Sequence, residues 1–147
     1  MTRSANEFLE ISINKNTFIP NFVNMAFACE LYLKTILEYK TQTYPRTHDL
    51  EILYNDVVKE IDEADFLVIL EEEIHVAFAA NDMDIMTIYA KTDLESMFEQ
   101  HKLLFEDWRY IFDGKVKKPY VVNMTLDSFA KALKRYIEEN INDEVTP

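Results

Sequence analysis

The stretch that decides the fold runs from Phe22 to Leu37 and reads FVNMAFACELYLKTIL. Its apolar side chains recur at intervals of three and four residues: Phe22, Met25, Ala26, Cys29, Tyr32, Leu33, Ile36 and Leu37. Such spacing places them on one face of an α-helix, and that face must be buried against another element. Pro20 suits the first turn of this helix. The segment Thr41–Pro45 stops it, so we predict a long amphipathic helix that ends near Lys40.

The same spacing recurs along the rest of the chain. Thr47 is expected to cap a second helix, with His48 and Asp49 in its first turn. Further helices are predicted over residues 62–80, over a segment opened by the capping box Thr92-Asp93-Leu94-Glu95 and closed by Asp113-Gly114, and over a segment that starts at Thr125 or Asp127. Each amphipathic helix needs a partner face, so the sequence predicts an all-α fold, a four- to five-helix bundle.

Length and composition predict one domain. A chain of 147 residues, 48% of them hydrophobic, is long enough for one core. We expect a single helical bundle over residues 1–140, followed by an acidic tail over residues 141–147. Cys29 is the only cysteine, which favours a reducing, cytoplasmic setting. No apolar run approaches the roughly 20 residues of a membrane-spanning helix, so no membrane partner is expected.

The charge is unevenly distributed. The chain carries a net charge of −12, which disfavours non-specific binding of nucleic acid over its whole surface. Residues 102–135, however, hold eight of the 15 lysines and arginines and only four acidic residues. This stretch is either a patch that faces an anion or a solvated basic surface.

Common catalytic and cofactor motifs are missing from the sequence. The three histidines and one cysteine lack the spacing of zinc ligands. Gly114 is the only glycine, so there is no glycine-rich phosphate loop. We therefore expect no metal and no cofactor.

Three polar features remain as candidate binding residues. Glu30 and Lys34 lie four residues apart beside the apolar stripe, as a groove-lining pair or as an ordinary helical ion pair. His48 and Asp49 lie at the expected N-terminus of a helix, whose partial positive charge favours anions. The alternative is that they only stabilise the start of this helix. The third feature is Arg109-Tyr110. The planar guanidinium of Arg109 suits a phosphate, and Tyr110 could stack on a base. The alternative is that Arg109 forms only an ion pair with Asp113.

These features together resemble the HEPN family. The first helix resembles the HEPN pattern Ala-x-x-x-Glu-x-x-Leu-Lys through Ala26, Glu30, Leu33 and Lys34. The segment Thr47-His48-Asp49-Leu50 is similar to the His-Asp-Leu element that often follows, and Arg109-Tyr110 is similar to a later Arg-Tyr element. The resemblance implies a helical bundle, often a homodimer with a polar groove between protomers. It also implies either a metal-independent RNase of toxin–antitoxin, antiphage or CRISPR-linked systems, or a non-catalytic module that binds RNA or a nucleotide.

The sequence departs from the catalytic pattern of the family, in which an arginine is followed after four to six residues by a histidine. No histidine follows Arg109. We therefore predict first a HEPN-like module that binds RNA or a nucleotide. The alternatives are a metal-independent endoribonuclease toxin whose His48 or His101 meets Arg109 in space, and a non-catalytic structural or partner-binding subunit, with a protein partner such as an antitoxin.

Overall fold

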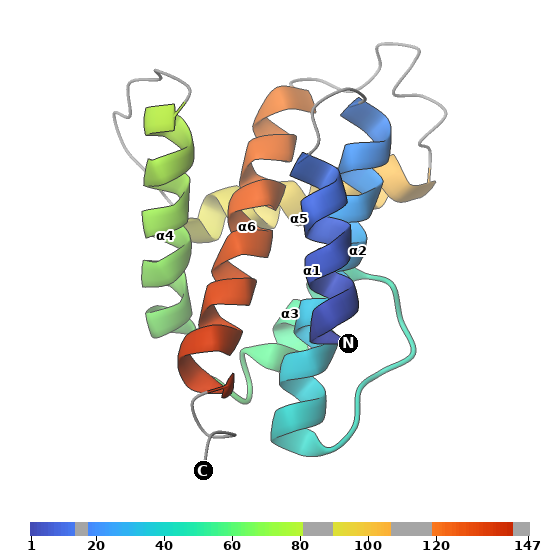
Figure 1. The fold of residues 1–147 in the computed structure, drawn as a ribbon, viewed down its shortest axis with the longest axis vertical. Helices are drawn as coiled ribbons and strands as arrows, with labels where there is room; N and C mark the ends of the chain where they lie inside the picture. The colour runs from blue at the N-terminus through green and yellow to red at the C-terminus, as the bar shows by residue number, and fades with distance from the viewer. Residues whose placement is uncertain (14–17, 81–89, 107–118, 143–147) are drawn as a thin grey trace.

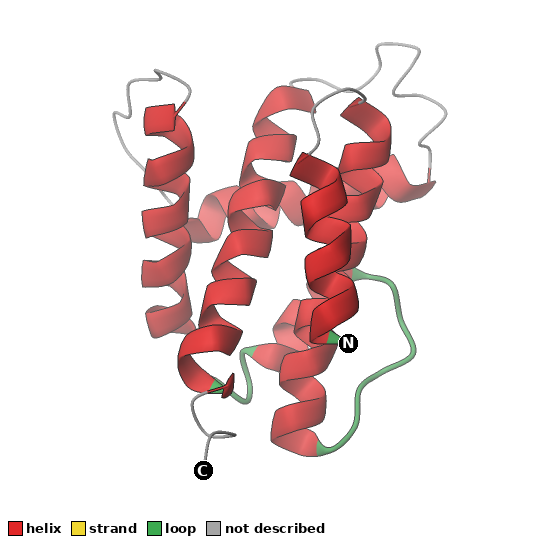
Figure 2. Cartoon of the chain, viewed as in Figure 1, coloured by secondary structure: helices red, strands yellow, loops and turns green. Residues whose placement is uncertain are grey.

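A computed structural model describes residues 1–13, 18–80, 90–106 and 119–142 of the chain. In these ranges it contains six helices and no strand (Figure 2). The helices are α1 (Thr2–Ile13), α2 (Phe18–Thr41), α3 (Leu50–Val57), α4 (Glu63–Ala80), α5 (Ala90–Glu106) and α6 (Pro119–Asn140). The prediction of an all-α bundle is confirmed. None of these helices is long and apolar enough to cross a membrane.

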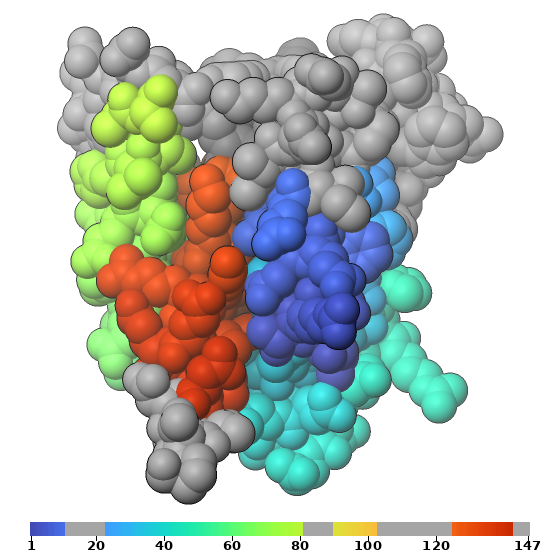
Figure 3. Space-filling model, in the orientation of Figure 1, coloured from blue at the N-terminus to red at the C-terminus, as the bar shows by residue number. Residues whose placement is uncertain are grey.

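Four of the helices lie side by side in the order α1, α2, α6, α4 (Figure 1). Helix α5 crosses behind them and contacts α6, α4 and α3. The short α3 also contacts α2. In the space-filling view, α1 and α6 cover the same face of the molecule, with α4 along its edge (Figure 3). The residues discussed below belong to α2, α3 and α5 and to the loop between α2 and α3; α3 contacts both α2 and α5.

Aromatic rings form the centre of the core. Phe129 of α6 meets Tyr54 of α3, Phe66 of α4 and Phe98 of α5 with ring centroids 5.6–6.0 Å apart, close to edge-to-face. The predicted core residue Cys29 is fully buried, with its thiol 3.9 Å from the carbonyl oxygen of Leu126. One core therefore connects α2, α3, α4, α5 and α6.

Helix α1 was not predicted. Over residues 2–10, where its side chains are described, the apolar residues that reach the core are Ala5 and Leu9, with Phe8 packed beside them. Ala5, Phe8 and Leu9 have helical spacing, but this stripe covers fewer residues than the stripe of α2. The helix is stabilised by its contact with α2, where the Tyr32 hydroxyl donates to Asn6 Oδ1.

Three predicted helix starts were wrong. Asp49, not Thr47, caps α3, because its side chain accepts from two backbone amides of the first turn. Thr92 lies inside α5, which begins at Ala90. Helix α6 begins at Pro119, where the fixed φ of proline suits a first turn, rather than at residue 125 or 127. The helix end predicted at residues 113–114 lies outside the described residues.

Candidate functional site

Glu30 is the centre of a buried ionic cluster on α2. The Lys34 ammonium lies 2.8 Å from Glu30 Oε1, one helical turn away. Both residues are buried, with exposed fractions of 6% for Glu30 and 8% for Lys34. Removing two such charges from water is unfavourable unless each is paired and hydrogen-bonded, so this is more than a surface ion pair.

His48 lies on the outer side of the same carboxylate. Its Nδ1 is 3.0 Å and 3.1 Å from the two Glu30 carboxylate oxygens. An ionised carboxylate only accepts hydrogen bonds, so Nδ1 must be the donor. The neutral imidazole then has its lone pair on Nε2, and the side chain is 71% exposed. Glu30, Lys34 and His48, here called the Glu30 cluster, thus present an oriented imidazole to solvent.

Tyr44 closes the other side of Lys34. The Lys34 ammonium lies 5.6 Å from the centre of the Tyr44 ring, within the range of a cation–π contact. Tyr44 itself is exposed, since 39% of its surface remains accessible. The loop between α2 and α3 therefore places an imidazole and a phenol ring over one buried ion pair.

Asp49 has a structural role beside this cluster. Its Oδ1 accepts from the backbone amides of Glu51 at 2.9 Å and Ile52 at 3.2 Å, which caps α3. Its Oδ2 lies 3.9 Å from the ammonium of Lys102, which also pairs with Glu51. Lys102 thereby links α5 to the start of α3.

His101 approaches the same region from α5. It is 4% exposed, and burial lowers its pKa to about 4, while the carboxylates of Asp49 and Glu30 act in the opposite direction. The side chain is consequently neutral at pH 7 and close enough to sense both carboxylates. His48 thus contacts the Glu30 carboxylate directly, whereas His101 is influenced by it only electrostatically.

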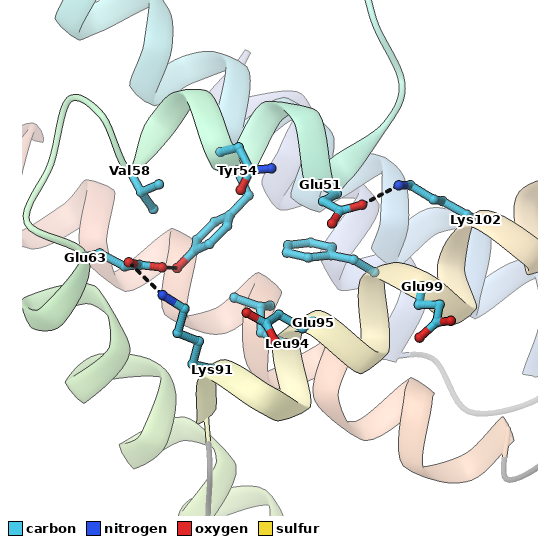
Figure 4. Close-up of a pocket in the computed structure, with 11 residues that line it drawn as sticks. Glu51, Tyr54, Val58, Glu63, Lys91, Leu94, Glu95, Glu99 and Lys102 are labelled. Atoms are coloured by element: carbon cyan, nitrogen blue, oxygen red, sulfur yellow. Dashed lines mark hydrogen bonds and ion pairs between the residues drawn. The ribbon is translucent and has the colours of Figure 1, made fainter.

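A pocket of about 630 Å³ adjoins this region between α3 and α5 (Figure 4). It begins at Glu51 and Lys102 and extends to Glu63 and Lys91. Figure 4 shows the two ion pairs Lys102–Glu51 and Lys91–Glu63 at opposite sides of the view, with Tyr54 also bonded to Glu63. We call this the α3–α5 pocket.

The family model of the HEPN domain matches residues 4–113, which include most of α1, all of α2 to α5 and every residue of the Glu30 cluster. The chain belongs to the HEPN family. No protein of curated function and no solved structure shows significant similarity to it.

The HEPN chain brings four of its six predicted site residues together. Glu30, Lys34 and His48 are in direct contact, and Asp49 follows His48 at the start of α3. Arg109 and Tyr110 lie outside the described residues.

Sequence reasoning missed Tyr44 and Lys102, whose contacts with Lys34 and Asp49 span 10 and 53 residues. Neither contact leaves a periodic signal in the sequence.

The buried His101 of the HEPN chain predicts acid sensitivity. Its folded-state pKa of about 4 lies below the ordinary value of 6.5, so the unfolded chain takes up the proton first as the pH falls. The free energy of unfolding therefore keeps its full value above pH 6.5 and falls as the pH is lowered toward 4. At pH 5, His101 is expected to lower it by roughly 2 kcal/mol.

Urea denaturation at pH 7 and pH 5 measures this effect. The variant His101→Gln should lose less stability between the two pH values than the wild type. The control His75→Gln changes a histidine of α4 whose side chain is 52% exposed, and should behave as the wild type. Equal acid sensitivity in His101→Gln and wild type would contradict the assignment.

Proposed function

We propose that this HEPN chain binds RNA or a nucleotide at the Glu30 cluster. The observation that carries the proposal is the exposed His48 imidazole, held by a carboxylate that is itself paired with a buried lysine. Holding one tautomer in one orientation is useful for a ligand-binding or proton-transferring histidine and is unnecessary for a purely structural one.

The chemistry of the surroundings suits a phosphate and a base. His48 Nε2 can accept from a ribose hydroxyl or, when protonated, donate to a phosphate oxygen. Tyr44 offers an exposed ring for stacking. The sequence adds Arg109, whose fork suits a phosphate, Tyr110 as a second ring, and the basic stretch 102–135. In this proposal Asp49 acts indirectly, by holding the start of α3 beside His48.

Fluorescence polarisation with labelled single-stranded RNA and with labelled ATP tests the proposal at low and at physiological salt. The variants His48→Ala and Arg109→Ala are expected to weaken binding about tenfold each, the effect of losing one hydrogen bond to a charged group. His75→Ala removes another exposed histidine and should bind as the wild type. An absence of binding at low salt, or the same loss in His75→Ala, would reject it.

A second candidate is a metal-independent endoribonuclease with a rearranged site. The Glu30–His48 contact favours it, because a carboxylate that orients a histidine is a common arrangement for proton transfer. His48 Nε2 would take the proton of a ribose 2′-OH while the 2′-oxygen bonds to phosphorus. The P–O5′ bond then breaks, the proton returns to the leaving 5′-oxygen, and Arg109 would stabilise the charge on phosphorus.

Incubation with total RNA in EDTA separates the two candidates. If the chain is a nuclease, the wild type cleaves, and His48→Ala and Arg109→Ala lose at least about 10²-fold in rate, whereas His75→Ala does not. Expression of the wild type should then arrest growth, and His48→Ala should relieve the arrest. Cleavage by neither the wild type nor the variants, with all of them folded, leaves the binding module.

We further propose that the protein is a cytoplasmic homodimer that acts in a toxin–antitoxin or antiphage system. A homodimer would form a polar groove between its protomers, as the HEPN resemblance implies. Sedimentation velocity tests the dimer, and a monomer at all concentrations would require each chain to bind its ligand alone.

A further inference from the structure

We infer that the α3–α5 pocket is a docking site for an arginine side chain on a basic segment of a protein partner. This inference goes beyond the binding of RNA or a nucleotide, because it concerns another surface and a ligand of opposite charge. The supporting observations are the volume of the pocket, its apolar floor and the arrangement of charge along α5.

The pocket has the size and lining of a side-chain binding site. Its volume of about 630 Å³ lies within the range usual for small-ligand pockets. Four side chains contribute an apolar lining: Tyr54 of α3, Val58 directly after α3, and Leu94 and Phe98 of α5. The Tyr54 and Phe98 rings lie 5.5 Å apart between their centroids, so two aromatic groups adjoin at the base. Aromatic and aliphatic surfaces of this kind accommodate the methylene stem and the flat face of an arginine.

Charged residues lie on one face of α5 along the pocket. Lys91, Glu95, Glu99 and Lys102 follow one another at intervals of four, four and three, and all four line it. The two lysines reach across to other elements, Lys91 to Glu63 at 3.3 Å and Lys102 to Glu51. The pocket thus already accommodates an ammonium group at each end.

The two glutamates between these lysines have no ion-pair partner among the described residues. Carboxylates four residues apart on a helix repel each other, so Glu95 and Glu99 destabilise α5 slightly while no cation lies near them. A cation placed between them would remove that repulsion. With four glutamates and two lysines in its lining, the pocket has a formal charge of −2.

These charges select the class of partner. A phosphate would be repelled from this pocket, because its lining is negative. A second copy of the same acidic chain is disfavoured at this pocket for the same reason. Arginine fits better than lysine, since its planar fork can donate to two carboxylates at once and stack on an aromatic ring. The occupant is therefore a basic segment that presents an arginine.

Fluorescence anisotropy with a fluorescein-labelled hexa-arginine peptide tests the inference on the full chain at low salt. The double variant Glu95→Gln/Glu99→Gln is expected to bind about tenfold more weakly, because two charge-assisted hydrogen bonds are lost. The matched control Glu38→Gln/Glu71→Gln removes the same charge from exposed positions on α2 and α4 and should stay within about twofold of the wild type. A hexa-lysine peptide should bind more weakly than hexa-arginine.

Three outcomes would overturn the inference. An equal loss in both double variants would mean that only net charge matters, and no binding at low salt would mean that no site exists. If the Glu95/Glu99 variant instead dissociates a dimer, the pocket holds a second copy. All four glutamates are exposed, so both variants should fold, which circular dichroism checks. His48→Ala should leave peptide binding unchanged, so failure of one proposal is distinguishable from failure of the other.

Discussion

Replacing Glu30 by alanine is expected to lower the free energy of unfolding by about 3–5 kcal/mol, because it leaves a buried ammonium without its counter-charge. Lys34 is 8% exposed and its salt bridge in the described structure is to Glu30. Its contact with the Tyr44 ring stabilises the ammonium far less than an ion pair with a carboxylate does. The same substitution removes the group that orients His48. Stability and ligand binding should therefore fall together in this variant.

Urea denaturation of Glu30→Ala, Lys34→Met and the double variant Glu30→Met/Lys34→Met measures this dependence. The double variant should recover most of the lost stability, because two apolar side chains can replace a buried ion pair. It should still lose RNA or nucleotide binding, which separates the fold from the site. Glu38→Ala changes an exposed glutamate of the same helix and should stay within about 0.5 kcal/mol of the wild type. A loss below about 1 kcal/mol in Glu30→Ala would contradict the burial of the pair.

Replacing Phe129 by alanine is expected to destabilise the protein by about 4 kcal/mol. Phe129 is fully buried, and its ring contacts Tyr54, Phe66 and Phe98, which belong to α3, α4 and α5. Truncation leaves a cavity where four helices meet, and no single helix can move to fill it. The loss combines the transfer free energy of the ring with the cavity and the broken edge-to-face contacts.

Thermal and urea unfolding of Phe129→Ala should show this loss. Val68→Ala removes apolar atoms from a side chain of α4 that is 57% exposed, and is expected to change stability by less than about 0.5 kcal/mol. Phe129→Leu, which keeps more volume, should fall between the two. Similar unfolding midpoints for Phe129→Ala and Val68→Ala would show that the aromatic cluster is not the centre of the core.

The helices that were predicted correctly are those whose stripe is long enough to be visible in sequence. Helix α2 has eight apolar residues at helical spacing, so its own sequence predicts the helix without reference to any other element. Among the described side chains of α1, the buried apolar residues are Ala5 and Leu9, and the helix packs against α2. The start of α3 was misplaced by two residues because Thr47 and Asp49 are both good caps. The Thr47 hydroxyl instead accepts from the Asp49 amide, at 3.1 Å.

The sequence by itself determined the all-α class, the buried face of α2 and the pairing of Glu30 with Lys34, since each depends on spacing within one helix. Only the tertiary structure decided that this pair is buried and that His48, 18 residues from Glu30, binds its carboxylate. It also decided that Lys102 reaches Glu51 across 51 residues and closes one end of the α3–α5 pocket. The reason is that periodicity defines which face of a helix is buried, whereas contacts between helices depend on the angles and offsets at which those faces pack.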